Sequence, residues 1–422
     1  MSLSFMTLPK LLLTSVLKTQ LKMFPIIDDN GNLQPHFIAI RDGISVNQTE
    51  VSNGFKNVMT ARFTDAVFFY NNDLKLGLDS MKSKLNKVNF IDGMGNMEEK
   101  TNRTINLTKN LAKKLGFTDE EIKLAEESAK FAYADLTSSI VYEFPELQGY
   151  MGGVYASKEN RPKEVAKALE EFYLPLTASS KLPESKIGAL VSLAGKLDTL
   201  SANFKAGQVP SGSEDPFALR RQAMGLVRII LANKWQLTIK DLVELSSKDL
   251  PENANNRLVE LNDFLWQRLQ NILEEKQIAQ DAIYAVKNYE VPFNVIVERA
   301  LILQDNLKSE HLLSVGEIAR RVVNILKKSP CQNANFSVEL LKEPSEIALN
   351  KALENLPKNI GNFEENLKNI ATLKEPLEIF FKEVMVNDKD EKIRNNRLAL
   401  LVKLEDVLTR QTADLSKLQK RG

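Results

Sequence analysis

Hydrophobic residues recur every three or four positions over most of the chain, which is the spacing that one face of an α-helix requires. The spacing begins at about Ser52 and continues almost to Gly422, with interruptions near Pro251, Pro292, Pro330 and Pro376. Its first series comprises Phe55, Val58, Met59, Phe63, Ala66 and Phe69. The pattern therefore predicts a mainly α-helical protein.

The first fifty residues have a different pattern. Two apolar runs, at 22–27 and 36–40, flank the segment Asp28-Asp29-Asn30-Gly31-Asn32. Asn and Gly both tolerate positive φ, and an Asn-Gly pair between apolar runs is typical of a β-hairpin. Because a lone hairpin is only marginally stable in water, we expect it to be the edge of a sheet whose other strands lie elsewhere or are missing.

Local signals mark the ends of several helices. Gly116 is expected to end a helix over 101–115, since glycine readily adopts the left-handed conformation. Thr118 and Glu121 have the spacing of a capping box at the start of the next helix. Asp215 followed by Pro216 predicts another helix start, with Asp215 as the N-cap. An interruption at 288–292 indicates a domain boundary.

Composition excludes several classes of protein and of site. The 422 residues suffice for two or three domains, and 43% hydrophobic residues exclude a largely disordered chain. Cys331 is the single cysteine, so the sequence has no intrachain disulfide and no cysteine pair for zinc. The two histidines, His36 and His311, lie outside any HExxH motif. No apolar run approaches the roughly 20 residues of a membrane span, which favours a cytoplasmic protein.

The formal net charge of +1 means that any nucleic-acid site must be a local patch. Residues 151–240 have a local excess, with thirteen Lys and Arg against eight Asp and Glu. Within them, Arg221 and Arg228 lie seven residues apart on one face of the predicted helix, whose capped start can hold phosphate. Alternatively the two arginines pair with nearby carboxylates, and the sequence leaves both interpretations open.

The segment Glu143–Tyr155 combines carboxylates, aromatic rings and glycines within thirteen residues. Glycines permit close backbone approach, and aromatic rings can stack on exposed bases. Aromatic residues are more often buried, so residue types alone favour a corner between helices with a role in the core.

The segment Asp388–Leu401 provides the strongest candidates for RNA contact: Arg394, Asn396 and Arg397. The two arginines are three apart on one helix face, and packing of Leu398 and Leu401 into the core is expected to turn part of that face towards solvent. Guanidinium and amide groups can read or stack on the unpaired bases of an anticodon. In the alternative interpretation, the arginines pair with Asp388, Asp390 or Glu391 and hold the turn.

Six segments stand out together: Ala61–Tyr70, Glu143–Gly152, Glu171–Pro175, Gly195–Leu200, Ser213–Arg228 and Asn395–Leu398. In this order they closely resemble the β subunit of the bacterial two-subunit glycyl-tRNA synthetase. The resemblance extends from about Leu8 to Leu418, and this chain resembles the C-terminal part of that longer subunit.

The resemblance implies a division of labour between two subunits. In this family the α subunit has the class II active site that activates glycine with ATP and Mg²⁺, and the β subunit binds tRNA(Gly). We therefore expect an α2β2 assembly in which this chain holds no cofactor and no metal. We also expect it to be inactive alone, since it has no glycine-rich phosphate loop.

The resemblance also implies three parts of the chain. Residues 1–50 correspond to the trailing edge of an upstream domain, with the hairpin. Residues 51–285 correspond to a helical domain related to HD-type metal phosphohydrolases. Residues 286–422 correspond to a helical bundle similar to the anticodon-binding domain of arginyl-tRNA synthetases.

The HD-type motif is incomplete in this sequence. The His-Asp pair corresponds to Ala134-Asp135, and a later acidic position falls at Gly195, with Asp198 nearby. Phe172 stands where the family often has His. Divalent metals in such sites need imidazole together with carboxylate, so Asp135 and Asp198 are expected to be remnants without a metal.

The sequence therefore predicts a tRNA-binding subunit that positions tRNA(Gly) for a partner's active site and has no complete active site itself. Two alternatives stay open. One is an HD-type metal-dependent phosphohydrolase on nucleotides that uses Asp135 and Asp198. The other is a purely structural assembly subunit, which would bind the α subunit but not RNA.

Overall fold

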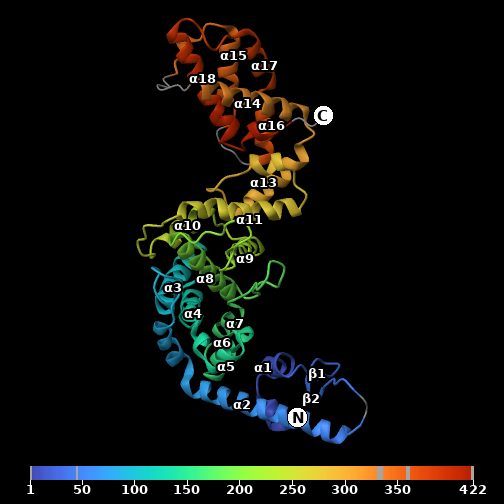
Figure 1. The fold of residues 1–422 in the computed structure, drawn as a ribbon. Helices are drawn as coiled ribbons and strands as arrows, with labels where there is room; N and C mark the ends of the chain where they lie inside the picture. Colours follow the sequence, from blue (N-terminus) through green and yellow to red (C-terminus); the bar gives the residue numbers. More distant parts are fainter. Residues whose placement is uncertain (1, 44–45, 330–335, 358–361, 420–422) are drawn as a thin grey trace. The chain divides into compact units, whose positions relative to one another are not determined.

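The structure is a computed structural model that describes residues 2–43, 46–329, 336–357 and 362–419. It is mainly helical, as the hydrophobic spacing predicts, and it divides into two compact units (Figure 1). The first unit comprises Met1–Lys234 and Asp241–Asn262, and the second comprises Trp235–Lys240 and Asp263–Gly422. The three-part division at residues 50 and 285 stays a prediction. Cys331 lies outside the described residues.

The first unit combines a hairpin with a helical body. Its strands and α-helices are α1 (Lys10–Ser15), β1 (Phe24–Ile27), β2 (Leu33–Ile38), α2 (Gln48–Ser83), α3 (Met97–Lys114), α4 (Asp119–Phe131), α5 (Ser139–Glu143), α6 (Tyr150–Lys158), α7 (Lys163–Glu171), α8 (Lys186–Lys205) and α9 (Leu219–Ala232). Short helical turns are η1 (Leu3–Thr7), η2 (Val16–Gln20), η3 (Lys84–Lys87), η4 (Ala134–Thr137), η5 (Pro145–Leu147) and η6 (Leu258–Glu260). Helix α8 forms the centre of this body, because nearly all of its residues are buried against α3, α4, α7 and α9.

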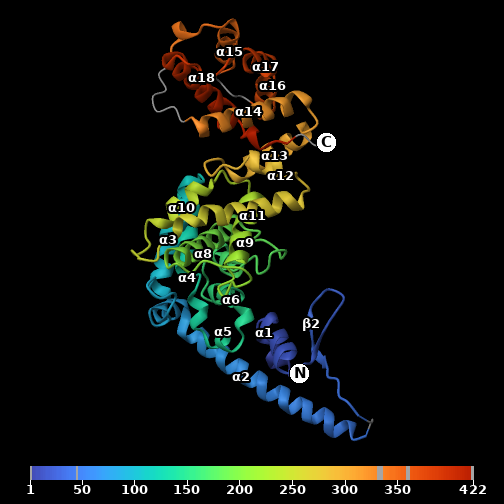
Figure 2. The same ribbon diagram turned by 45° about the horizontal axis from the view of Figure 1, so that its top comes forward.

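The predicted hairpin is confirmed. Strands β1 and β2 pair antiparallel, with Phe24 opposite Ile38, and the turn contains Gly31 at a φ of +76°. The pair is a two-stranded sheet, and no further strand joins it among the described residues. Helix α1 and the hairpin lie beside α2 in both ribbon views (Figures 1 and 2). Helix α2 bends at Gly77, whose φ of +73° is left-handed.

The helix-end signals are confirmed at α3 and α4 and need a correction at α9. Gly116 follows α3 with a φ of +72°, and Thr118 and Glu121 form the capping box of α4. Helix α9 begins at Leu219, not directly after Asp215, because Ala218 adopts a left-handed φ of +52°. The Asp215 carboxylate still accepts hydrogen bonds from the first two N–H groups of the helix, at 2.7 and 2.9 Å.

The second unit is a helical bundle. Its helices are α12 (Gln280–Ala285), α13 (Phe293–Asn306), α14 (Glu310–Lys328), α15 (Pro344–Glu354), α16 (Phe363–Ala371), α17 (Lys374–Glu383) and α18 (Glu391–Thr409), with the short turns η7 (Val338–Leu340) and η8 (Leu415–Lys417). Helices α10 (Ile239–Ser247) and α11 (Leu261–Glu275) each contain a boundary between the units. Helix α14 packs against α16, α17, α18 and η8. No helix in the described ranges is long and apolar enough to cross a membrane.

Candidate functional site

Arg397, the leading RNA-contact candidate, lies inside the second unit. Its side chain is 5% exposed. The guanidinium donates to the carboxylate of Glu346 on α15, to Asp388 Oδ2 at 2.8 Å and to the Met385 carbonyl at 2.8 Å. The part of the arginine-bearing face that reaches solvent is therefore at Arg394 and not at Arg397, because α15 and the 385–388 segment cover Arg397.

Asn396 is also buried, and it makes two hydrogen bonds with one backbone residue. Its Oδ1 accepts from the Ser337 N–H at 2.8 Å, and its Nδ2 donates to the Ser337 carbonyl at 3.0 Å. Arg394 is partly exposed and donates to the Asp388 carbonyl at 3.3 Å. The pairing of Arg397 with Asp388 is the alternative that the sequence left open. RNA contact by Arg394, Asn396 and Arg397 stays a prediction.

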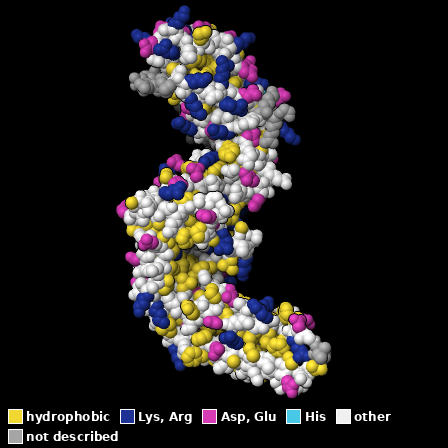
Figure 3. Space-filling model, in the orientation of Figure 1, with side chains coloured by type: hydrophobic (Ala, Val, Ile, Leu, Met, Phe, Trp, Pro, Cys, Tyr) yellow, Lys and Arg dark blue, Asp and Glu magenta, His cyan; other side chains and the backbone are white. Residues whose placement is uncertain are grey.

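A groove that sequence reasoning missed lies between α12, α14 and the segment after α18. We call it the C-terminal groove; it has a volume of about 530 Å³. It is lined by Gln280, Asp281, Tyr284, Arg320, Val323, Asn324, Lys327, Ser416, Lys417 and Gln419. Figure 3 shows many Lys and Arg side chains over the second unit on the face drawn. The available signal was the spacing of Arg320, Asn324 and Lys327, which puts them on one face of α14.

The residues of the C-terminal groove combine an aromatic ring, hydrogen-bond donors and basic side chains with one carboxylate, that of Asp281. Tyr284 is 46% exposed, and Asn324 and Lys327 are exposed on α14. Arg320 donates to the Ser416 carbonyl at 3.2 Å and also to the Leu418 carbonyl, so it fixes the wall formed by η8. Lys417 is half-exposed, and its Nζ lies 3.6 Å from Asp414 Oδ2. Such a surface can stack on one base and contact neighbouring phosphates.

The two candidate arginines of α9 have different surroundings. Arg228 donates to the carbonyls of Ala178 and Ser180, at 2.5 and 3.1 Å, and so fixes that loop. Arg221 is exposed and has no hydrogen bond or ion pair within the described ranges. Burial, with a smaller contribution from the charge of Arg221, lowers the pKa of Lys196 to about 7. RNA contact by Arg221 and Arg228 stays a prediction.

Asp198 is buried between two cations. It lies 2.8 Å from Lys100 Nζ and 2.7 Å from Arg103 Nε. Burial raises the pKa of Asp198, but the two cations outweigh this effect and hold it below its ordinary value. The carboxylate is therefore fully engaged in a structural ion cluster.

Asp135 has a separate structural role. Its Oδ2 accepts from the Gly149 N–H at 2.6 Å, at a turn where Gly149 has a φ of +80°. Burial raises the pKa of Asp135 to about 6, against the opposing effect of the backbone N–H groups. The carboxylate thus fixes the start of α6.

The residues present do not fit the metal of an HD-type enzyme. Phe172 packs against Gly195 so closely that a Cβ at position 195 would lie 2.6 Å from the phenyl ring. The Phe172 ring also meets Tyr133 edge-on, with 4.9 Å between centroids. No group of three or more His, Cys, Asp or Glu side chains that could hold a metal occurs in the described ranges. Phe172 is taken up in aromatic packing and Asp198 is paired with two cations, so neither residue offers a free ligand to a metal.

The segment Glu143–Tyr155 has mainly the core role that residue types favour. The Tyr155 hydroxyl donates to buried Asp73 at 2.8 Å, and Phe144 and Met151 are buried. The sequence did not reveal that its carboxylates hold the N-terminal helices: Glu146 accepts from Ser15, and Glu143 accepts from Gln20 at 2.7 Å.

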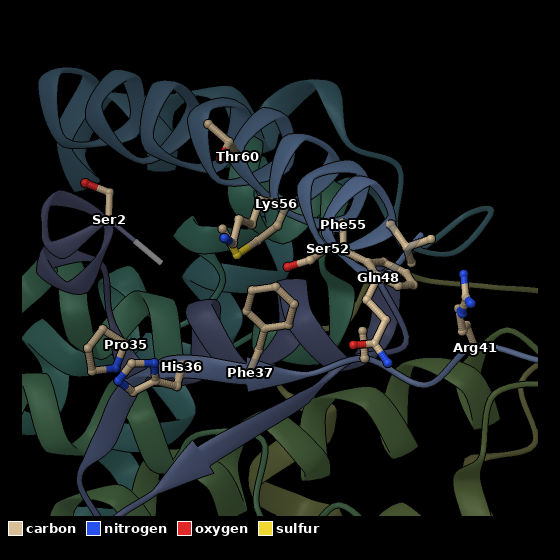
Figure 4. A pocket seen from close by; sticks show the side chains of 13 residues that line it. Ser2, Pro35, His36, Phe37, Arg41, Gln48, Ser52, Phe55, Lys56 and Thr60 are labelled. Atoms are coloured by element: carbon tan, nitrogen blue, oxygen red, sulfur yellow. The ribbon is translucent and has the colours of Figure 1, made fainter. Parts of the chain in front are cut away.

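A second groove, of about 550 Å³, lies between β2 and α2. Figure 4 shows Phe37 pointing from β2 towards α2, near Ser52 and Phe55. His36 lies on the same strand, whereas the other histidine, His311, lies on α14 in the second unit. The two histidines therefore belong to different units, so neither unit contains a pair of histidines.

Comparisons with known proteins agree on one family. The model of the family "Glycyl-tRNA synthetase beta subunit" matches residues 1–288, and the model "DALR anticodon binding domain" matches residues 317–414. The Glycine--tRNA ligase beta subunit of Bacillus subtilis (strain 168) is 35% identical over 409 residues, which cover 95% of this chain and 59% of that protein. The subunit of the same name from Janthinobacterium sp. (strain Marseille) is 35% identical over 425 residues, or 98% of this chain and 60% of that protein. The chain thus spans about 60% of the length of these relatives.

Proposed function

The chain belongs to the family of glycyl-tRNA synthetase beta subunits, and we propose that it binds tRNA(Gly) for glycylation by a partner α subunit. In this proposal the chain works in a cytoplasmic α2β2 assembly. The α subunit uses ATP and Mg²⁺ to activate glycine, and this chain alone forms no glycyl-adenylate. Its contribution is to hold the tRNA so that the 3′ end reaches the active site, which is catalysis by orientation.

The C-terminal groove carries the proposal. Helix α14, which supplies its basic face, lies largely within the matched anticodon-binding domain. An anticodon is single-stranded, so its bases are free to stack on Tyr284 or to hydrogen-bond with the amide of Asn324. Lys327 and Lys417 provide charge for the adjoining phosphates.

The first unit supports the proposal as a scaffold. Its central region is proposed to be a degenerate HD-like domain without phosphohydrolase activity, and the ion cluster at Asp198 and the packing of Phe172 support this. Exposed Arg221 is proposed as a weaker contact to the RNA backbone. Arg228 is proposed to position the 178–180 loop, because its guanidinium donates hydrogen bonds to two carbonyls of that loop.

A binding titration with tRNA(Gly) transcript tests the proposal. Lys327→Ala is expected to weaken binding about threefold to tenfold, because one phosphate contact is lost. Lys328→Ala is the matched control: it removes an exposed lysine of the same helix that does not line the groove, and its affinity is expected to stay within twofold. Equal effects of the two variants, or no measurable tRNA binding by the chain, would contradict the proposal.

A further inference from the structure

A third groove lies in the first unit, between α6 and α7. One face of each helix lines it: Tyr150, Gly153 and Ser157 recur at three- and four-residue spacing on α6, as do Lys163 and Ala166 on α7. Thr7, Pro9 and Tyr70 complete the lining. A Cβ at Gly153 would lie 2.8 Å from the Ala166 carbonyl, so glycine permits the close approach of the two helices. The groove has a volume of about 490 Å³, which is in the range of small-ligand sites.

One end of this groove attracts anions. Lys158 and Lys163 are exposed there, and neither has a hydrogen bond or an ion pair in the described part of the chain. Helix α7 begins at Lys163, and no side chain caps its first N–H groups. Free N–H groups at a helix start add to the attraction of the two ammonium groups. Lys167 also lines the groove, and its Nζ forms ion pairs with Glu170 Oε2 at 3.5 Å and with Glu171 Oε1 at 3.4 Å.

A buried hydroxyl without a partner also lines the groove. Tyr70 on α2 is 5% exposed, and its hydroxyl has no hydrogen-bond partner among the described residues. A buried hydroxyl that makes no hydrogen bond is costly, so native structures rarely contain one without a reason. A ligand with polar atoms in the groove supplies the missing partner.

The rest of the wall is apolar and partly aromatic. Pro9, Val154 and Ala166 contribute aliphatic surface, and Tyr150 contributes a half-buried ring. A cationic end next to an aromatic wall fits a ligand that has both a phosphate and a flat ring. We propose that the groove between α6 and α7 binds a single nucleotide unit, with its phosphate at Lys158 and Lys163 and its base along Tyr150.

The proposal does not depend on RNA binding by the C-terminal groove, because the two grooves belong to different units. The nucleotide unit has two possible sources: a free ribonucleotide or an unpaired residue of an RNA strand. Both present the same chemistry to the groove. Binding of mononucleotides and of a short RNA to the same variants distinguishes them.

Isothermal titration calorimetry on the full chain tests the proposal with three probes: the four ribonucleoside 5′-monophosphates, the matching nucleosides and inorganic phosphate. At least one monophosphate is expected to bind at least tenfold more tightly than its nucleoside and than inorganic phosphate. The double variant Lys158→Ala/Lys163→Ala is expected to lose at least tenfold in affinity. Tyr70→Phe keeps the ring and is expected to lose threefold to tenfold.

The control variant is Lys123→Ala, which removes an exposed lysine of α4 outside the groove and is expected to change affinity less than twofold. A single-stranded hexaribonucleotide that binds at least tenfold more tightly than the mononucleotide, through the same lysines, identifies RNA as the source. Similar affinities identify a free nucleotide. The proposal is overturned if no probe binds saturably, if inorganic phosphate binds as tightly as the monophosphates, or if the groove variants bind like the control.

Discussion

Helices α14 and α18 of the second unit have similar polar residues in opposite surroundings. Both carry an arginine, an asparagine and a further basic residue within eight positions, but those of α14 line an open groove and two of those of α18 are buried. The apolar residues of α14 occupy one face, whereas α18 has the continuous buried run Leu398–Leu401. Residue type and spacing therefore do not decide which polar groups stay accessible. Packing against segments distant in the sequence decides it, as Glu346 and Met385 do at Arg397.

The largest expected effect is on α18. Arg397→Ala leaves buried Glu346 without its cationic partner, and loss of one member of a buried pair typically costs about 3–5 kcal/mol. Urea unfolding measures this free energy. Arg394→Ala, on the same helix and partly exposed, is expected to cost less than about 1 kcal/mol. If Arg397→Ala has wild-type stability and discriminates less between anticodons, Arg397 contacts RNA and its pair with Glu346 does not stabilise the fold.

The buried carboxyl group of Asp135 has no cationic partner, in contrast to the buried Arg397–Glu346 pair. Asp135 has a pKa of about 6, above its ordinary value of 3.8, so folding favours its protonated form. Its contribution to stability is therefore fully present below about pH 4 and is lost as the pH rises through 6, by about 3 kcal/mol. Asp135→Asn removes this dependence.

Urea unfolding of wild type and Asp135→Asn at pH 4 and pH 7 measures the effect. The variant is expected to gain about 3 kcal/mol relative to wild type between the two pH values. Asp92→Asn replaces an exposed carboxylate and is expected to follow wild type at both. If Asp135→Asn also follows wild type, the carboxyl titrates normally and its burial is not the controlling factor.

Asn396→Ala is expected to have an intermediate effect. The change removes two hydrogen bonds and leaves the Ser337 backbone groups without partners, which costs about 1–3 kcal/mol. Thermal unfolding detects the loss, and the exposed neighbour substitution Lys392→Ala serves as the reference. A variant with wild-type stability and weakened tRNA binding would mean that Asn396 faces RNA and not Ser337.

The smallest change in stability is expected on α14. Lys327→Ala should leave the unfolding free energy within about 0.5 kcal/mol of wild type, since the side chain is exposed. Its effect should appear in binding, where the slope of log affinity against log salt concentration decreases by about 1. An unchanged slope would assign Lys327 to a surface that RNA does not reach.

Local features of the fold were predictable, and distant contacts were not. The turn at Gly31 and the capping box at Thr118 are set by neighbouring residues, so the sequence predicts them correctly. The helix α9 begins later than the sequence predicts, because Ala218 adopts a left-handed conformation. An alanine in a sequence does not indicate such a conformation. The partner of Arg397 is Glu346, 51 residues away, and no local pattern reveals such a contact.

The same limit applies to the sites. The C-terminal groove brings Tyr284, Lys327 and Lys417 together from three separate segments. The groove between α6 and α7 depends on Tyr70, which lies 80 residues before Tyr150 in the sequence. The resemblance to a family indicated RNA binding, but only packing reveals which polar groups stay accessible.

Discrimination between anticodons tests the central claim, that the C-terminal groove reads the anticodon, most directly. The measurement is the ratio of the affinities of the chain for tRNA(Gly) and for the same tRNA with an altered anticodon, in wild type and in Asn324→Ala. We expect the ratio to fall about fivefold or more in the variant, because the variant lacks the amide that we propose contacts a base edge. The same ratio in both proteins would contradict the account.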